Sequence, residues 1–316
     1  MNHELVDEQA APGSARDTIP THDKDSFCKY LTATVTMSVL DTLLVRWSSP
    51  TIFNDPFDLQ TSIRFAFTTE EFMAALAAEI ERRVLSEDEP HGDPKNGIFG
   101  MIKALWLVRG TLSKSEFSRS MKGPFDTGGL VIGRQLKQFN DEWEAFVSTL
   151  RLFCVAEEHD DLLMWAHYAH GHTGAVIRLR CIPELDTALC AALPVTYADN
   201  LPVLGELEQW VRQMAGLVKQ EPGHDIFVRF VCTKSRHWSY EKEWRALSAA
   251  KPGHPPGYEM FKLWPQEIDT VYLGCRMDHE MKKAILGRIR GELSHVRVFE
   301  GTRSDSRFSL DFRRVL

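Results

Sequence analysis

Two glutamates separated by one residue lie in the stretch WSYEKEWR, residues 238–245, which is the densest group of reactive side chains in the chain. An extended backbone alternates its side chains, so Glu241, Glu243 and Arg245 are expected on one face of a strand. The aromatic residues of the stretch are expected on the other, buried face. Two carboxylates at this spacing repel, which raises the pKa of one of them. A raised pKa prepares a carboxylate as a general base or as a group that binds a ribose hydroxyl. Arg245 could instead neutralise both acids in an ion-pair lattice, and the spacing leaves both interpretations open.

A polar turn, FNDPFD, begins at Phe53 and offers a second group of acids. Asp55 precedes a proline and is therefore pushed to an extended conformation, while Asn54 and Asp55 can both bond nearby backbone groups. The motif predicts a rigid structural corner. The functional alternative is a cluster of Asn54, Asp55 and Asp58 at the mouth of a cleft.

A third group lies in DDLLMWAHYAHGHTG, residues 160–174. Asp160 or Asp161 is expected to cap a helix of about three turns, which Gly171 ends in a left-handed conformation. The helical spacing places the ring of His167 beside an apolar wall. His167 and Tyr168 then form a ligand-facing pair that offers hydrogen bonds and a stacking surface.

Metal binding is not predicted, although histidines at positions 167, 170 and 172 are potential nitrogen ligands. Their HxxHxH spacing crosses the expected helix end, and the chain contains no HExxH motif. The six cysteines form no CxxC pair and sit mostly in apolar runs, which is typical of reduced residues in a cytosolic protein.

The composition is that of a globular protein, with 316 residues, 43% hydrophobic and 26% charged. A net charge of -7 argues against a protein that holds nucleic acid chiefly by a basic surface. The amino terminus resembles neither a signal peptide nor a transit peptide, and no apolar run approaches the roughly 18 residues of a membrane span. A cytoplasmic location is expected, and a leaderless secretion route would leave the same sequence.

These groups must be positioned by an α+β fold with a mixed, mostly antiparallel sheet. Residues 1–25 are polar and predict a disordered leader, and residues 26–316 predict a single domain. A strand, a short helix and a second strand ending at Pro50 open this domain, and residues 69–150 form a helical insertion whose first helix is capped by Thr69. Further strands are expected at 151–157, 174–180, 193–198, 243–249, 269–274, 296–301 and 308–312, helices at 206–220 and 278–293, and either element at 225–232.

Five separated motifs occur in an order that resembles a widespread bacterial family of unknown function: FCKY, WSSPTIFNDPFD, FCVAEEHDDLLMWAHYAHGHTGAVIRL, KSRHWSYEKEWR and IDTVYLG. The match runs from about Phe27 to the carboxyl terminus, and the family carries no established activity. The order of elements also resembles the ADP-ribosyltransferase fold. In that fold a polar residue on the first strand, a strand followed by a helix with an aromatic residue, and a late strand bearing glutamate surround NAD.

The second resemblance implies an NAD-consuming enzyme, an ADP-ribosyltransferase or an NAD glycohydrolase, that acts in phage defence or as a toxin. Its catalytic residues would be Glu243, Glu241 and His167. The residues that bind NAD would be Lys29, Tyr30, Trp165, Tyr168, Asn54, Asp55, Asp58, Trp238 and Arg245. The chain departs from the pattern at Ala156, where a serine is frequent, and at Lys29, where histidine or arginine is usual.

Two other classes of function stay open. One is a nucleic-acid-directed enzyme or sensor, in which the acids, His167 and the tryptophans form a nuclease or base-stacking site. The other is a binding module without activity, whose aromatic motifs anchor the core. Both enzyme hypotheses require Glu241, Glu243, Lys29 and the His167–Tyr168 pair to meet at one cleft. The sequence specifies neither a macromolecular target nor an oligomeric state.

Overall fold

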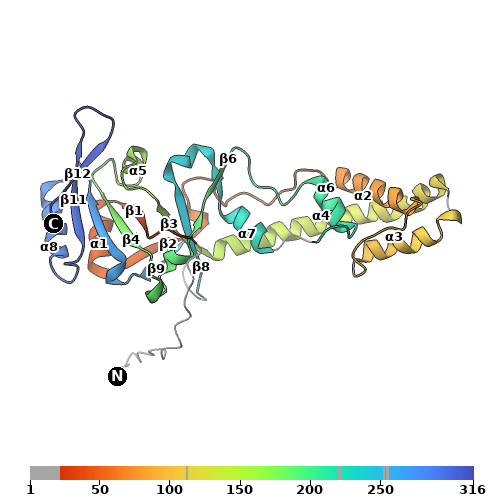
Figure 1. Cartoon of the computed structure of the whole chain (residues 1–316), viewed down its shortest axis with the longest axis horizontal. Helices are drawn as coiled ribbons and strands as arrows, with labels where there is room; N and C mark the ends of the chain where they lie inside the picture. The colour runs from red at the N-terminus through yellow and green to blue at the C-terminus, as the bar shows by residue number, and fades with distance from the viewer. Residues whose placement is uncertain (1–21, 112, 220–222, 252, 254–255) are drawn as a thin grey trace, which may run out of the picture. The chain divides into compact units, whose positions relative to one another are not determined.

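The computed structural model describes residues 22–111, 113–219, 223–251, 253 and 256–316 (Figure 1). Contacts divide the chain into two compact units. Unit 1 comprises the chain up to Ser49, Leu150–Thr196 and Arg236–Leu316, and unit 2 comprises Pro50–Thr149 and Tyr197–Ser235. Unit 2 is therefore made of two segments inserted into unit 1.

Unit 1 is built on a sheet that contains ten strands within the described residues. They are β1 (Ser26–Leu31), β2 (Leu44–Ser48), β3 (Leu150–Ala156), β4 (Ala175–Arg180), β5 (Leu193–Pro194), β8 (Glu243–Ala249), β9 (Tyr258–Lys262), β10 (Ile268–Leu273), β11 (Arg297–Arg303) and β12 (Leu310–Arg314). Their order is β12-β11-β10-β4-β1-β3-β2-β9, and β8 pairs with both β3 and β5. The pair β10 and β11 is parallel and the other pairs described are antiparallel, which confirms the predicted mixed, mostly antiparallel sheet of an α+β fold.

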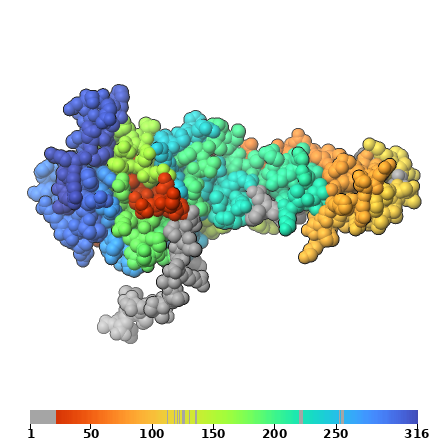
Figure 2. All heavy atoms as spheres, viewed as in Figure 1, coloured from red at the N-terminus to blue at the C-terminus, as the bar shows by residue number. Residues whose placement is uncertain are grey.

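In the part of unit 1 that the structure describes, three helices accompany this sheet: α1 (Ala33–Thr42), α5 (Leu162–His167) and α8 (His279–Ile289). Four short 3-10 helices complete the unit: η3 (Pro183–Leu185), η4 (Ala188–Ala191), η5 (Arg236–Glu241) and η6 (Pro265–Glu267). The hairpin of β11 and β12, dark blue in Figures 1 and 2, projects from the unit beside α5.

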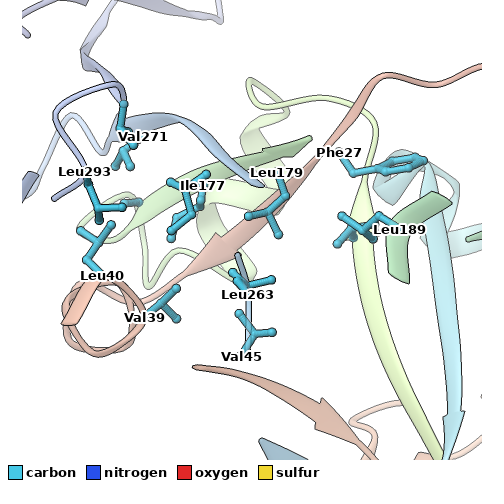
Figure 3. Close-up of a cluster of buried hydrophobic side chains, with 14 of the residues drawn as sticks. Phe27, Val39, Leu40, Val45, Ile177, Leu179, Leu189, Leu263, Val271 and Leu293 are labelled. Carbon is cyan, nitrogen blue, oxygen red and sulfur yellow. The ribbon is translucent and has the colours of Figure 1, made fainter. Parts of the chain in front are cut away.

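Strand β1 separates two hydrophobic cores because it is buried on both faces. Phe27 belongs to the larger core, which α1 and α8 cover and which Figure 3 shows. Cys28 and Tyr30 belong to the smaller core, which α5 covers through Met164 and Trp165. The period of two along a strand produces this division, and it determines which side chains of the sheet can share a site with α5.

Unit 2 is mainly helical. Its helices are α2 (Thr69–Val84), α3 (Gly97–Leu107), α4 (Lys114–Thr149), α6 (Leu207–Met214) and α7 (Gly223–Val231), with the 3-10 helices η1 (Pro50–Ile52) and η2 (Arg109–Thr111). The strands β6 (Thr196–Ala198) and β7 (Thr233–Ser235) pair with each other at the second insertion. Phe72, Leu76 and Ile80 repeat at helical spacing on α2 and form the core of this unit with residues of α3, α4 and α6.

Several predicted boundaries differ from the structure. The predicted insertion, residues 69–150, corresponds to part of unit 2, which begins at Pro50 and includes a second segment. The cap of α2 is Thr68, not Thr69: its hydroxyl accepts a hydrogen bond from the backbone of Glu71 at 3.1 Å, and the Glu71 carboxylate accepts one from the backbone of Thr68 at 2.7 Å. This reciprocal pair satisfies two helix-end donors that Thr69 would leave open.

The predicted leader, residues 1–25, lies outside the described residues as far as residue 21. From His22 onwards the chain packs against unit 1. The His22 ring forms a hydrogen bond of 2.8 Å with the carbonyl of Leu189 and packs edge-on against Phe27 and Trp244. Lys24 forms an ion pair with Glu157 at 3.1 Å.

Candidate functional site

Three of the motif strands of unit 1 meet at the carboxyl end of β3. Ala156, the last residue of β3, pairs with Cys28 of β1 on one edge and with Glu243 of β8 on the other. The motif residues of β1 and β8 therefore flank one point of the sheet. Trp244 of β8 belongs to the larger core, so Glu243 and Arg245 lie on the opposite face, as the alternation of a strand requires.

Glu243 and Arg245 form an ion pair within β8. Arg245 Nε donates to Glu243 Oε1 at 2.9 Å, and a second guanidinium nitrogen donates to Glu243 Oε2 at 3.4 Å. The residues are 5% and 0% exposed, so the pair is withdrawn from water. Burial also raises the pKa of the neighbouring Cys154 thiol well above its usual value, and the charge of Glu243 adds to the effect. Arg245 therefore neutralises one of the two acids, Glu243, in an ion pair.

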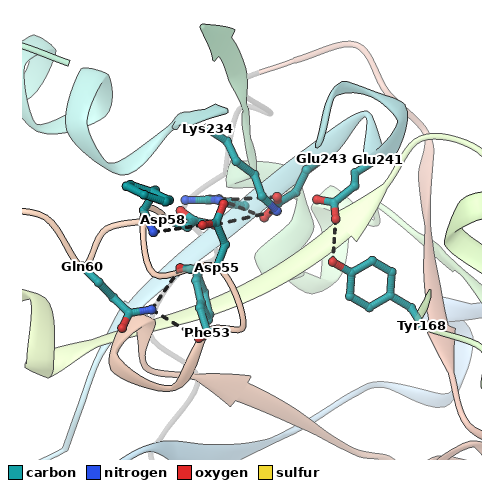
Figure 4. Close-up of polar contacts among 10 residues, drawn as sticks. Phe53, Asp55, Asp58, Gln60, Tyr168, Lys234, Glu241 and Glu243 are labelled. Atoms are coloured by element: carbon teal, nitrogen blue, oxygen red, sulfur yellow. Dashed lines mark hydrogen bonds and ion pairs between the residues drawn. The ribbon is translucent and has the colours of Figure 1, made fainter. Parts of the chain in front are cut away.

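Glu241 has different surroundings. It is the last residue of η5 and is 4% exposed, and its Oε1 accepts a hydrogen bond of 2.5 Å from the hydroxyl of Tyr168 (Figure 4). The prediction of a continuous strand from residue 238 is wrong, because residues 236–241 form a 3-10 helix and Lys242 has a left-handed backbone with φ of 43°. This turn reorients the backbone between the two acids, so they do not lie as neighbours on one face of a strand.

The charges of both acids act on Lys29 of β1. Its Nζ donates to the carbonyl of Cys154 at 2.5 Å and stands 5.0 Å from the centre of the Phe153 ring. Burial lowers the pKa of Lys29, and the negative charges of Glu243 and Glu241 oppose that shift. Of the residues required to converge, Tyr168 contacts Glu241, and Lys29 is within electrostatic range of Glu241 and Glu243.

His167 is placed differently from the prediction. Helix α5 ends at His167, earlier than the predicted three turns, and its side chain is exposed and not beside an apolar wall. Its Nδ1 forms a hydrogen bond of 3.0 Å with the hydroxyl of Tyr240. The remaining turns before β4 include His170, Gly171 and His172 with positive φ, which confirms the predicted left-handed conformation at Gly171. Asp161 is the cap of α5, and it accepts from the backbone of Met164 at 2.9 Å.

Two predicted NAD-binding aromatic residues are core residues. Trp165 has no exposed surface, and its indole donates to the carbonyl of His159 at 2.8 Å. Tyr30 is buried, and its hydroxyl donates to the carbonyl of Glu158 at 3.0 Å. Neither ring presents a face to a ligand in this structure. Trp238 is half-buried in η5 and packs at a tilt against Tyr240 at 6.1 Å.

The FNDPFD turn belongs to unit 2 and is the rigid corner that its sequence predicts. Asp55 Oδ1 accepts from the backbone of Phe57 at 2.9 Å, and the Asp55 carbonyl accepts from the backbone of Asp58 at 3.1 Å. Gln60 donates to the Asp55 carbonyl at 3.0 Å, as Figure 4 shows. Asp58 is buried and lies 3.7 Å from the ammonium of Lys234. Asn54 is exposed.

No family model matches the chain, and comparisons with curated proteins and with solved structures also find no similar protein. Within the described residues, no cluster of three histidine, cysteine or acidic side chains has the arrangement of a metal site. None of the helices in the described ranges has both the length and the apolar character to cross a bilayer. The assignment of a function therefore depends on the geometry of the site.

Tyr240 and Cys154 are members of the site that the sequence analysis did not select. Tyr240 contacts the ring of His167, and Cys154 pairs with Arg245 across β3 and β8. The alternation of FCVAE places Cys154 on the same face as Ala156, and this pattern is the sequence feature that indicates Cys154 as a member of the site. Tyr240 had no such signal, because the 3-10 helix that turns it towards α5 was not predicted.

Proposed function

We propose that this chain is an NAD-consuming enzyme that breaks the bond between nicotinamide and ribose. The observation that carries the proposal is the meeting of β1, β3 and β8 at Ala156, together with the Tyr168–Glu241 hydrogen bond and the effect of both acids on Lys29. These are the positions that the resemblance to ADP-ribosyltransferases assigns to NAD. The pairing of these strands and the hydrogen bond to Glu241 support the proposal, and fold analogy alone would not.

Glu241 is assigned the chemical role. When the bond breaks, its electron pair leaves with the nicotinamide nitrogen, and the ribose carbon becomes an oxocarbenium-like cation. A buried carboxylate stabilises this charge and accepts a hydrogen bond from a ribose hydroxyl. Water, or a nucleophile on a target, then adds to the cation and loses its proton.

Glu241 is nearly buried, so the ribose hydroxyl must replace a group that now contacts it. The Tyr168 hydroxyl is such a group, and the exchange of one O–H donor for another retains the hydrogen bond to the carboxylate. Glu243 is assigned a positioning role, because both of its carboxylate oxygens bond the guanidinium of Arg245. The ion pair fixes the start of β8, immediately after Glu241.

The test is to incubate the purified chain with NAD and to quantify nicotinamide by chromatography. Mass spectrometry of the small molecules and of the protein distinguishes free ADP-ribose, the product of a glycohydrolase, from ADP-ribose attached to protein. We expect nicotinamide and ADP-ribose in equal amounts. NAD that remains intact, and that gives no binding heat in calorimetry, would contradict the proposal.

A further inference from the structure

A pocket in unit 1 contains none of the residues of the candidate site. Its volume is about 630 Å³, and it lies between the β11–β12 loop, α5 and the segment after β10. This size is within the range of about 300–1,000 Å³ that small-molecule and cofactor sites occupy. We call it the arginine pocket, after Arg276, Arg303 and Arg307 in its wall.

The charge of the wall favours an anion. The lining residues include three arginines and one acidic residue, Asp305. Within the described residues, the side chains of Arg276 and Arg303 form no hydrogen bond or ion pair, and Arg307 has only a long contact of 3.9 Å with the exposed Asp311. Arginine is the side chain that best matches phosphate oxygens, because its donors form a planar fork.

Two polar atoms in the same wall point to a ligand independently of the arginines. His172 Nδ1 and Ser309 Oγ are buried, and neither has a hydrogen-bond partner among the residues that the structure describes. A buried polar group without a partner is destabilising, so such groups are rare unless a ligand or ion completes them. Burial, followed by the charge of Arg276, lowers the pKa of His172, so its imidazole is neutral at pH 7. A neutral imidazole and a hydroxyl can each donate to a phosphate oxygen.

The base of the pocket is rigid. The rings of His172 and Trp165 are parallel within 8° at a centroid distance of 6.1 Å. The backbone of Arg276 donates to the carbonyl of His172 at 3.0 Å, which holds the two side chains next to each other. Gly274 permits this close approach, since a Cβ there would lie 2.2 Å from the same carbonyl. A site built on such a base needs little reorganisation to bind.

The rim of the pocket presents an aromatic ring on which a nucleotide base can stack. Phe308, at the tip of the β11–β12 loop, is fully exposed although it is a large apolar residue, and it lines the pocket beside Arg307. Nucleotide-binding sites combine an aromatic ring with arginines, because the base stacks on the ring while the phosphates form ion pairs with the arginines. We infer that the arginine pocket binds a nucleoside phosphate, through Arg276, Arg303, His172 and Ser309 at the phosphate and Phe308 at the base.

The experiment is calorimetric titration of the full-length protein with ADP, inorganic pyrophosphate and adenosine. We expect ADP to bind more tightly than pyrophosphate, and both to bind more tightly than adenosine. Arg276→Gln and Arg303→Gln should each weaken ADP binding roughly tenfold, the effect of losing a hydrogen bond to a charged group. Phe308→Ala should weaken binding of ADP and leave that of pyrophosphate unchanged.

Arg290→Gln is the matched control, because Arg290 is exposed at the end of α8 and lies outside the pocket. Wild-type protein that binds neither ADP nor pyrophosphate would overturn the inference, as would an Arg276→Gln/Arg303→Gln variant with wild-type affinity. ADP binding no tighter than that of pyrophosphate would overturn the assignment of a nucleoside. The test is separate from the proposed NAD chemistry, because Glu241→Gln should leave ADP binding at this pocket intact.

Discussion

At the scale of residues, each of the two glutamates of WSYEKEWR is held by a hydrogen bond or an ion pair. Glu241 is bonded by a phenol, and Glu243 by the guanidinium of Arg245 in the same strand. The resemblance to the ADP-ribosyltransferase fold implied that Lys29, His167, Tyr168 and the two acids share one site. The different surroundings of the acids could not be predicted, since they depend on the left-handed backbone of Lys242. The alternating aromatic residues of this stretch are equally compatible with a strand.

The burial of the Glu243–Arg245 pair leads to a prediction about stability. Arg245→Met removes the guanidinium and leaves a buried carboxylate, so the free energy of unfolding should fall by about 3–5 kcal/mol. A Glu243→Leu/Arg245→Met variant should be less destabilised than Arg245→Met alone. Urea denaturation measures both differences.

The control for this pair is Arg82→Met in α2, where Arg82 forms an exposed ion pair with Glu79. The expected change in the free energy of unfolding there is below about 1 kcal/mol. An Arg245→Met variant as stable as Arg82→Met would show that the buried pair contributes nothing.

At the scale of elements, close backbone contacts fix the position of α5 and its following turns against the sheet. A Cβ at Gly174 would lie 2.1 Å from the carbonyl of Leu31 in β1, so the turns before β4 depend on glycine. Gly174→Ala should lower the free energy of unfolding by about 1–3 kcal/mol, the usual cost of overpacking, and should displace Tyr168 from Glu241. Thermal denaturation and the rate of NAD consumption measure the two effects.

Gly287→Ala provides the comparison, because Gly287 is an exposed residue of α8 with no atom within 4 Å of an added Cβ. Alanine there should raise stability by about 0.5–1 kcal/mol through its higher helix propensity. Equal effects of the two substitutions would show that the contact at Gly174 does not constrain the fold.

Most elements of the two units were predictable because their apolar periods are clear, and the strand 243–249 agrees with β8 in every residue. The exceptions have physical causes. The first half of α4 contains Gly123, Gly128 and Gly129, which weaken a helical pattern, yet the helix runs from Lys114 to Thr149. Strand β9 follows a proline- and glycine-rich stretch, and no strand was predicted there. Both elements form because packing in the folded chain outweighs local preference.

At the scale of the whole molecule, each of the two inserted segments connects two strands that pair with each other. Ser48 of β2 pairs with Leu152 of β3 across the first insertion, and β6 pairs with β7 across the second. Loops of about four residues can join such neighbouring strands. A shortened chain with loops from Ser49 to Leu150 and from Ala198 to Thr233 should therefore fold by itself.

Circular dichroism and a cooperative urea transition would detect the folded state of the shortened chain. The larger and the smaller hydrophobic core on the two faces of β1 lie entirely in unit 1, so loss of unit 2 removes no residue from them. A chain that aggregates or unfolds without cooperativity would show that unit 1 is not an independent folding unit.

The central claim is that Glu241 carries the reaction with NAD, and its most direct test is the rate of nicotinamide release by Glu241→Gln. Glu292→Gln is the matched control, because Glu292 is exposed and lies after α8. Removal of the carboxylate charge should slow release on the order of 100-fold, comparable with the loss of one transition-state partner, while the control keeps the wild-type rate. A folded Glu241→Gln protein that releases nicotinamide as fast as the wild type would contradict this account.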